Sequence, residues 1–242
     1  NEVIVPVTVT RPFLISVHEV TNKQFADFRN NHDSGADVHP SLAADDNPVA
    51  NVSWADAVQY CNWLSKQEGR TPAYALEFDK WVAVYPTPDG YRLPTEAEWV
   101  LAARYAGGQQ ARKFAWGDNW PPPKGVGNLA DVSARELVPS VLPGYDDGYA
   151  STAPVGKFKP NALGLFDTAG NVAEWVNDIY TIPTPGVTTP VVDPVGAESG
   201  NNHVVRGSSW RHAGITELRL SYRDYSSEPR PDIVFRIARY AQ

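Results

Sequence analysis

The chain has 242 residues, a formal net charge of −7 and 42% hydrophobic residues. It has no concentrated run of Lys and Arg of the kind that binds phosphates, so a nucleic-acid partner is not expected. No apolar run approaches the roughly 20 residues that cross a bilayer, so no membrane span is expected. The length fits one large domain or two small ones. Because the sequence shows neither a repeat nor a linker-like change of composition, we predict one domain over residues 1–242.

Cysteine occurs once, at Cys61, and methionine does not occur. A single thiol excludes an intrachain disulfide, a thiolate zinc site and a redox pair of cysteines. The chain begins at Asn1 with no visible signal peptide, and we expect a processed or trimmed product. Its 8 Trp, 21 Pro and 18 Gly predict much irregular backbone that aromatic packing holds together.

The first two elements are predicted strands, because residues 3–9 and 13–17 are rich in apolar and β-branched side chains. Three helices follow. Each is predicted to begin with a capping box, in which a hydroxyl and a side chain three residues later satisfy backbone amides reciprocally, the second being a variant with a shorter acidic side chain. The pairs are Thr21 with Gln24, Ser53 with Asp56, and Thr95 with Glu98.

The second helix has the clearest pattern. Trp54, Cys61 and Leu64 share one face at helical spacing, and Gly69 is placed to end the helix. Cys61 is therefore predicted to be a small, buried, hydrophobic side chain. The third helix is predicted at about residues 95–105.

The second half of the chain is predicted to be mostly loop. Residues 107–149 and 178–202 contain the Gly and Pro residues that interrupt regular structure. Strands are predicted at residues 204–206 and 233–237. If the first and last strands pair, they bring the two ends of the chain together.

Several ordered motifs resemble one known family. Residues 19–25, 48–54, 91–99 and 170–175 recur in this order in the sulfatase-modifying-factor, or formylglycine-generating-enzyme-like, domain family. Residues 205–210 and 234–237 resemble its closing motifs, so the resemblance covers nearly the whole chain from about Pro12. It implies an α+β, C-type-lectin-like fold with a small antiparallel sheet core, few helices and much irregular loop.

The resemblance also implies one or two structural calcium sites. Hard cations prefer carboxylate, amide and carbonyl oxygens, and both candidate segments offer them. Turn residues capped by their own Asp and Asn side chains would show the same residue types. The first predicted site consists of Asp167, the carbonyls of Gly170 and Val172, and Glu174, and the second of Asn128, Leu129, Asp147 and Tyr149.

Catalysis by the family enzyme is not expected here. That enzyme binds copper(I) through two cysteines that follow its Arg-Gly-Gly-Ser motif, because soft thiolates select this metal. The corresponding residues 207–219 contain no cysteine, so neither copper nor formylglycine-forming oxidase activity is expected. A replacement metal centre would use His212 with Glu217, Asp224 or His203, as in the two-histidine, one-carboxylate iron sites. A hydrogen-bonding loop histidine explains His212 equally well.

The same C-terminal stretch is a candidate ligand surface. In the family fold this segment lines the substrate groove, and Trp, Tyr and Arg dominate recognition hot spots. Alternation of aromatic and Arg residues also builds cation–π scaffolding, and we expect Arg206 and Arg236 to be structural. The predicted ligand-binding residues are Trp210, Arg211, His212, Glu217, Tyr222 and Arg223.

These observations predict a calcium-stabilised recognition or scaffold domain, a pseudoenzyme that binds a protein, peptide or glycan. We expect it to belong to a larger bacterial protein. A periplasmic or extracellular location is favoured, because free calcium there fills weak sites. Two alternatives are an oxygen-using enzyme with a replaced, iron-type metal centre near His212, and a sulfatase-modifying enzyme that depends on a partner.

Overall fold

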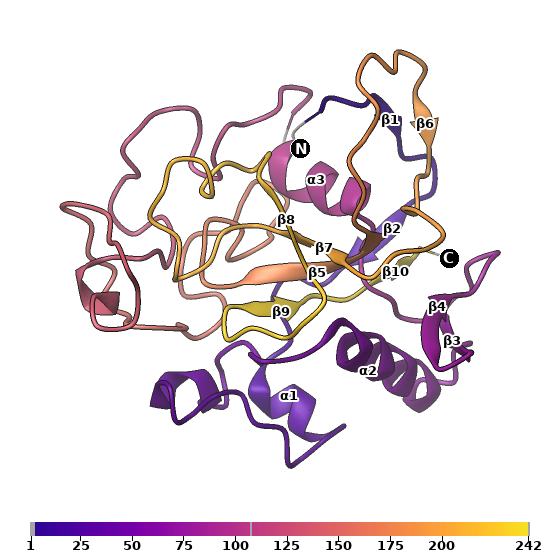
Figure 1. Cartoon of the computed structure of the whole chain (residues 1–242), viewed down its shortest axis with the longest axis horizontal. Coiled ribbons are helices and arrows are strands. Elements are labelled where there is room, and N and C mark those ends of the chain that lie inside the picture. Colours follow the sequence, from indigo (N-terminus) through magenta and orange to yellow (C-terminus); the bar gives the residue numbers. More distant parts are fainter. Residues whose placement is uncertain (1–2, 107, 242) are drawn as a thin grey trace.

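A computed structural model describes residues 3–106 and 108–241 of the chain, which combine few helices with long loops (Figure 1). The predicted loop region begins at Gly107, and that residue lies outside the described ones, as do Asn1, Glu2 and Gln242. None of the described helices is both long and apolar enough to cross a membrane. The helices are α1 (Asn22–Ala26), α2 (Trp54–Gln67), α3 (Glu96–Arg104) and the short 3-10 turns η1 (Pro40–Ala43) and η2 (Val132–Ala134).

All three predicted capping boxes are present. The hydroxyls of Thr21, Ser53 and Thr95 each accept the backbone N–H three residues later, and the side chain of that later residue accepts the N–H of the capping residue. Helix α2 ends as predicted, with Gly69 in the left-handed region at φ +68°. The caps therefore fix where each α-helix begins.

The central sheet has four strands in the order β8, β7, β5, β9. Strand β7 runs antiparallel to both β5 and β8. Strand β9 runs parallel to β5, so the core sheet is not entirely antiparallel. The bounds are β5 (Ala173–Ile179), β7 (His203–Arg206), β8 (Arg223–Ser226) and β9 (Ile233–Phe235).

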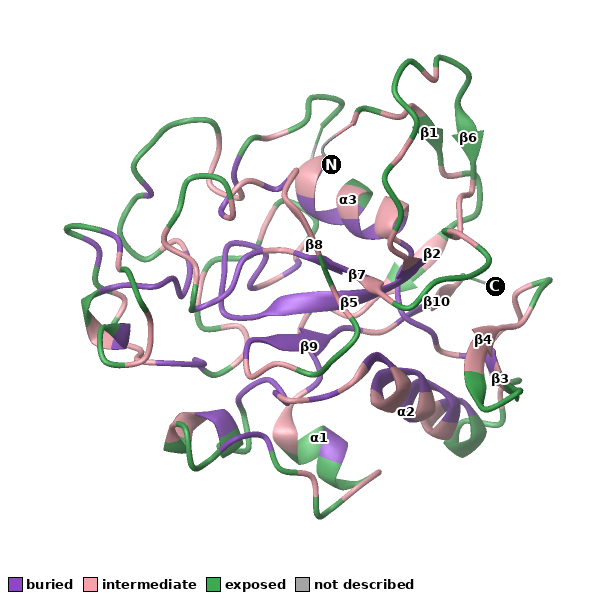
Figure 2. Ribbon diagram, viewed as in Figure 1, coloured by how far each residue is buried: buried purple, intermediate pink, exposed green. Residues whose placement is uncertain are grey.

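Helices cover the two faces of this sheet. Successive strand residues point to opposite faces. Trp175 and Val205 pack into the core cluster that contains α2, whereas Val176 and Val204 pack against α3. Figure 1 shows α2 and α3 on either side of β5, and Figure 2 shows that β5 and β9 are buried, whereas β8 is only partly buried. Strand β5 is buried at nearly every position, which explains why the sequence shows no strand-like alternation there.

Three small two-stranded sheets complete the fold. Strand β2 (Phe13–Ile15) pairs with β10 (Ala238–Tyr240), so segments near both ends of the chain do meet. The predicted pairing of the first strand was nevertheless wrong. Strand β1 (Val7–Thr8) pairs in parallel with β6 (Val191–Val192), which lies inside a predicted loop. Strands β3 (Tyr74–Glu77) and β4 (Lys80–Ala83) form a hairpin.

Candidate functional site

A buried ion pair lies at the centre of the first predicted calcium site. Arg236 follows β9, and its guanidinium donates to both carboxylate oxygens of Glu174 on β5, at 2.6 Å each. The indole Nε1 of Trp99 donates to the same carboxylate at 2.8 Å. All three side chains are buried. Glu174 therefore has both oxygens engaged by protein donors, and Arg236 is structural as predicted.

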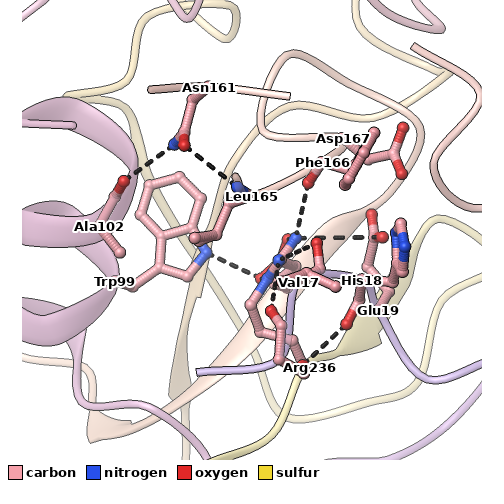
Figure 3. Close-up of polar contacts among 12 residues, drawn as sticks. Val17, His18, Glu19, Trp99, Ala102, Asn161, Leu165, Phe166, Asp167 and Arg236 are labelled. Carbon is pink, nitrogen blue, oxygen red and sulfur yellow. Dashed lines mark hydrogen bonds and ion pairs between the residues drawn. The ribbon is translucent and has the colours of Figure 1, made fainter. Parts of the chain in front are cut away.

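Two further carboxylates lie beside this pair (Figure 3). Asp167 is 4% exposed, and its Oδ2 accepts the N–H of Gly156 at 2.7 Å. Glu19 is 1% exposed, and its Oε2 is 4.0 Å from the nearest nitrogen of Arg236. Within the described residues, Oδ1 of Asp167 and both oxygens of Glu19 have no hydrogen-bond partner. Burial raises the pKa of Asp167 to about 6 and, together with the charge of Asp167, raises the pKa of Glu19.

The second predicted calcium site is formed by loops that pack together, and it contains a second pair of carboxylates. The carboxylate of Asp147 accepts the N–H of Leu129 at 2.9 Å and that of Tyr149 at 3.0 Å. Asp131, which the sequence did not suggest, accepts the N–H of Asp147. Burial raises the pKa of Asp147 to about 7, and the charge of Asp131 acts in the same direction.

Asn128 offers an oxygen at this second site. Its Nδ2 donates to the carbonyl of Ser151 at 2.7 Å and to the side chain of Asn171 at 3.1 Å, which fixes the orientation of the amide. Its Oδ1 is buried and has no partner among the described residues. A buried acceptor without a donor is costly, and a hard cation would satisfy it. These residues therefore fit a calcium ion.

The two predicted sites touch each other. The carbonyl of Asn128 accepts the N–H of Asn171 at 2.8 Å. Gly170 makes this approach possible, because a Cβ at that position would lie 2.2 Å from the same carbonyl oxygen. The carbonyl of Gly170 itself accepts the N–H of Val172 at 3.0 Å. No group of three His, Cys, Asp or Glu side chains in the described chain is arranged to hold a metal, so calcium here would also need amide or carbonyl oxygens.

The predicted ligand surface centres on His212. The backbone N–H of Ser209 donates to Nδ1 of His212 at 3.1 Å, and the Ser209 hydroxyl donates to Asp232 at 2.8 Å. Because a backbone N–H only donates, Nδ1 is an acceptor, and the neutral ring carries its proton on Nε2. Burial lowers the pKa of His212, which favours this neutral form. The ring thus presents an N–H donor.

The predicted pair of metal-binding histidines was wrong. His203 stacks on Trp54 with ring centroids 3.8 Å apart, and burial lowers its pKa to about 4. It begins β7, and this extended strand leads the chain away toward Arg206 before His212 is reached. Asp224 is bound by Arg230 at 2.8 Å. The two-histidine, one-carboxylate site is therefore not assembled within the described residues.

Two residues of the predicted ligand surface belong to the scaffold instead. Trp210 is 1% exposed and packs in the main core, because the turn after β7 directs the large indole inward. Arg223 donates to both oxygens of Glu96 at 2.6 and 2.8 Å and so joins β8 to α3. Of the other four predicted residues, Arg211 is exposed, and His212, Glu217 and Tyr222 are half-buried, as Arg223 is.

The chain's one thiol is not suited to catalysis. Cys61 is fully buried on the core face of α2, as predicted. Burial in this apolar environment raises the pKa of the thiol and disfavours the reactive thiolate.

Comparisons with known proteins agree with the motifs. The sulfatase-modifying factor enzyme 1-like domain model matches residues 4–241. The chain is 35% identical to the formylglycine-generating enzyme of Streptomyces coelicolor over 83% of this chain and 68% of that protein. It is 32% identical to the chaperone protein LppX of Paenibacillus barcinonensis, with 71% and 64% of the two chains covered. The inactive C-alpha-formylglycine-generating enzyme 2 of Mus musculus is 28% identical, with 83% and 64% covered.

Solved structures show the same fold. Treponema denticola variable protein 1 superposes with a TM-score of 0.79 at 27% identity, covering 97% of this chain and 86% of that one. CarF gives 0.66 at 26% identity, with 95% and 87% covered. The chain spans only 35% of the formylglycine-generating enzyme of Bos taurus, to which it is 37% identical over 68% of its own length. The chain belongs to the sulfatase-modifying-factor, or formylglycine-generating-enzyme-like, family and has its α+β, C-type-lectin-like fold.

Proposed function

We propose that the chain is a non-catalytic recognition or scaffold domain that binds a protein, peptide or glycan. The observation that carries this proposal is the lack of any cysteine in residues 207–219, together with the deep burial of Cys61. Copper(I) selects thiolates, and this chain has none to offer at an accessible position. Relatives named as an inactive formylglycine-generating enzyme and as a chaperone support a role without oxidation.

The binding surface consists of Arg211, His212, Glu217 and Tyr222. His212 presents a fixed N–H donor, and Glu217 presents a carboxylate whose Oε2 has no partner within the described residues. Burial and nearby acids raise the pKa of Tyr222 to about 12, so its hydroxyl stays protonated at neutral pH. Such a mixture of fixed donors and acceptors beside an aromatic ring suits the amides of a peptide or the hydroxyls of a glycan.

Calcium stabilises the loops beneath this surface. Asn128 and Asp147 supply side-chain oxygens, and Leu129 and Tyr149 supply carbonyls. Within the described residues, the carboxylates of Asp131 and Asp147 accept hydrogen bonds from backbone N–H groups and form no ion pair, and a bound calcium ion supplies the positive charge that balances them. The N–H of Ala130 donates to the carbonyl of His212 at 3.1 Å, so this loop directly supports the binding surface. The weak affinity of such oxygen sites favours a periplasmic or extracellular location.

Binding is tested with peptide and glycan arrays probed by the calcium-loaded protein. We expect a reproducible ligand class whose binding falls at least tenfold in Tyr222→Ala and His212→Ala. Phe78→Ala is the matched control, because Phe78 is an exposed aromatic residue at the tip of the β3–β4 hairpin. Equal losses in all three variants, or no bound class at all, would contradict the proposed surface.

Catalysis is tested separately with a cysteine-containing sulfatase peptide, copper and oxygen. We expect mass spectrometry to show an unmodified cysteine. Aldehyde formation by the purified chain would overturn the non-catalytic assignment. The fixed Nδ1 acceptor also disfavours an iron centre at His212, because the neutral ring then has no free lone pair for a metal. Iron added without oxygen should therefore give the same spectra for wild type and His212→Ala.

A further inference from the structure

The loop of residues 113–120 presents an exposed tryptophan on a buried aromatic base. Trp120 is 41% exposed, and the centroid of its ring lies 5.8 Å from that of Phe114, which is fully buried. Trp116 stacks on the same phenyl ring, with centroids 4.8 Å apart and an angle of 3° between the planes. Phe114 therefore anchors both indoles to the body of the protein.

Hydrogen bonds fix the shape of this loop. The backbones of Phe114 and Gly117 exchange two hydrogen bonds, at 2.8 and 3.1 Å. The indole Nε1 of Trp116 donates to the carbonyl of Asn119 at 2.9 Å, and the N–H of Lys113 donates to Oδ1 of Asp118 at 2.9 Å. The loop is thus already ordered before a ligand arrives, and such preorganisation lowers the free-energy cost of binding.

Polar side chains lie beside the exposed indole. Asp118 and Asn119 come directly before Trp120, and both are exposed. The exposed Lys113 places its Nζ 5.1 Å from the centroid of Phe114. A carboxylate, an amide and an ammonium group together accept and donate hydrogen bonds. A pyranose matches this arrangement, because its C–H face is attracted to the negative face of an indole while its hydroxyls bond to polar groups at the edge.

The aromatic loop adjoins the proposed recognition surface. Phe114 and Leu218 pack in the same core cluster, and the N–H of Leu220 donates to the carbonyl of Lys113 at 2.9 Å. Leu218 directly follows Glu217, which belongs to that surface. Trp120 therefore continues the recognition surface beyond Glu217.

The loop is not built like a peptide-binding site. An extended peptide adds to a free strand edge or places its side chains in pockets. Within the described residues, no strand lies between α3 and η2. The backbones of Phe114 and Gly117, which form an isolated bridge, already pair with each other. The loop thus offers an aromatic face with polar neighbours and no strand edge.

We propose that Trp120, Asp118 and Asn119 form a subsite for one pyranose ring, so that the ligand of the recognition surface is a glycan. The sugar stacks on the indole of Trp120, and its hydroxyls bond to the side chains of Asp118 and Asn119. Trp116 and Phe114 are positioning residues, because they hold Trp120 without being the exposed face. This inference rests on the proposed recognition role, whose ligand class it names.

Isothermal titration with soluble hexasaccharides of glucose, mannose, galactose and N-acetylglucosamine tests the proposal on the calcium-loaded chain. We expect one of these sugars to bind and Trp120→Ala to weaken binding about tenfold or more, as loss of a hot-spot tryptophan does. Trp120→Tyr keeps an aromatic face and should retain most of the affinity. The control Phe78→Ala removes an exposed aromatic ring elsewhere and should bind like wild type.

Saturation-transfer NMR shows the stacking itself. The C–H protons of the bound sugar should receive saturation from the protein's aromatic protons in wild type and lose most of it in Trp120→Ala. Unchanged affinity in Trp120→Ala, or no binding of any hexasaccharide, would overturn the subsite. Peptide binding that depends on Tyr222, without sugar binding, would leave the recognition surface standing and refute the glycan. Sugar binding that needs Trp120 but not His212 or Tyr222 would support the subsite and refute the recognition surface.

Discussion

The acids in the first turn of α3 and those in the loops of residues 128–167 carry the same carboxylate group in opposite situations. Beside α3, Arg92 donates to both oxygens of Glu98 at 2.6 and 2.7 Å, and Arg223 does the same for Glu96. In the loops, Asp147 and Asp167 accept only backbone N–H groups. A carboxylate paired with an arginine has its charge balanced by that side chain, whereas a carboxylate held only by amides does not.

The two loop acids both have raised pKa values. Burial raises the pKa of Asp147 to about 7 and that of Asp167 to about 6. Each of these two acids lies near a second carboxylate that acts in the same direction. A raised pKa means that the folded protein disfavours the charged form. Calcium would reverse this preference by stabilising the charged carboxylates.

Removing Arg236 should have the largest effect on stability. Arg236→Leu leaves Glu174 buried without a cation, and loss of one partner of a buried pair costs about 3–5 kcal/mol. Urea unfolding at pH 7.5 measures the loss. Arg211→Leu, at an exposed arginine, should change stability by less than about 0.5 kcal/mol. A loss below about 1 kcal/mol for Arg236→Leu would contradict its structural role.

Trp210 distinguishes core from surface in the predicted ligand segment. Trp210→Ala should destabilise the protein by about 3–5 kcal/mol, because it creates a large cavity in the main core. Trp120→Ala, at an exposed indole, is the control and should cost much less. Urea unfolding again gives the comparison. Unchanged stability in Trp210→Ala would return this residue to the candidate binding surface.

Calcium removal should affect the loops more than the α3 region. Free calcium at 100 times its dissociation constant adds about 2.7 kcal/mol per site, so chelation should lower the Tm by about 5–11 °C for each site lost. Differential scanning calorimetry measures the shift, and magnesium at the same ionic strength is the control. Hydrogen exchange should then rise in residues 128–149 and not in α3. Uniform loosening of the chain would contradict the division into two regions.

Asp178 is an acid beside α3 that receives a backbone N–H instead of an arginine bond. Its carboxylate accepts the N–H of Glu96 at 2.7 Å, and burial raises its pKa to about 8. Protonation therefore favours the folded state. The contribution is complete below about pH 4, the unfolded pKa, and is lost as the pH rises toward 8. Asp178→Asn should be more stable than wild type at pH 8 and lose this advantage at pH 4.

Urea unfolding between pH 4 and pH 8 checks this smallest effect. A constant difference across that range would mean that Asp178 does not titrate in the folded protein. The matched control is Glu198→Gln, an exposed acid that should follow wild type at every pH.

Local chemistry made part of the fold predictable. The three capping boxes, the buried face of α2 and the structural roles of Arg206 and Arg236 depend on residue type and spacing, and the structure confirms them. Strand β5 escaped prediction because both of its faces are buried, which removes the alternation of polar and apolar residues. The β3–β4 hairpin escaped because its turn residues Phe78 and Asp79 adopt positive φ without glycine.

The candidate sites depend on contacts between distant parts of the chain. Glu19 was part of a recognised motif, but its missing partners become visible only when Asp167 and Arg236 are placed beside it. The burial of Trp210 likewise depends on how the turn after β7 meets the core, which no local pattern encodes.

Metal analysis of the purified, unstripped protein tests the central claim most directly. This chain should use oxygen ligands to hold hard cations and have no accessible thiolate for a soft one. Inductively coupled plasma mass spectrometry should find calcium near two equivalents per chain and copper and iron well below one. A stoichiometric redox metal, or a folded protein free of calcium that calcium does not stabilise, would contradict the account.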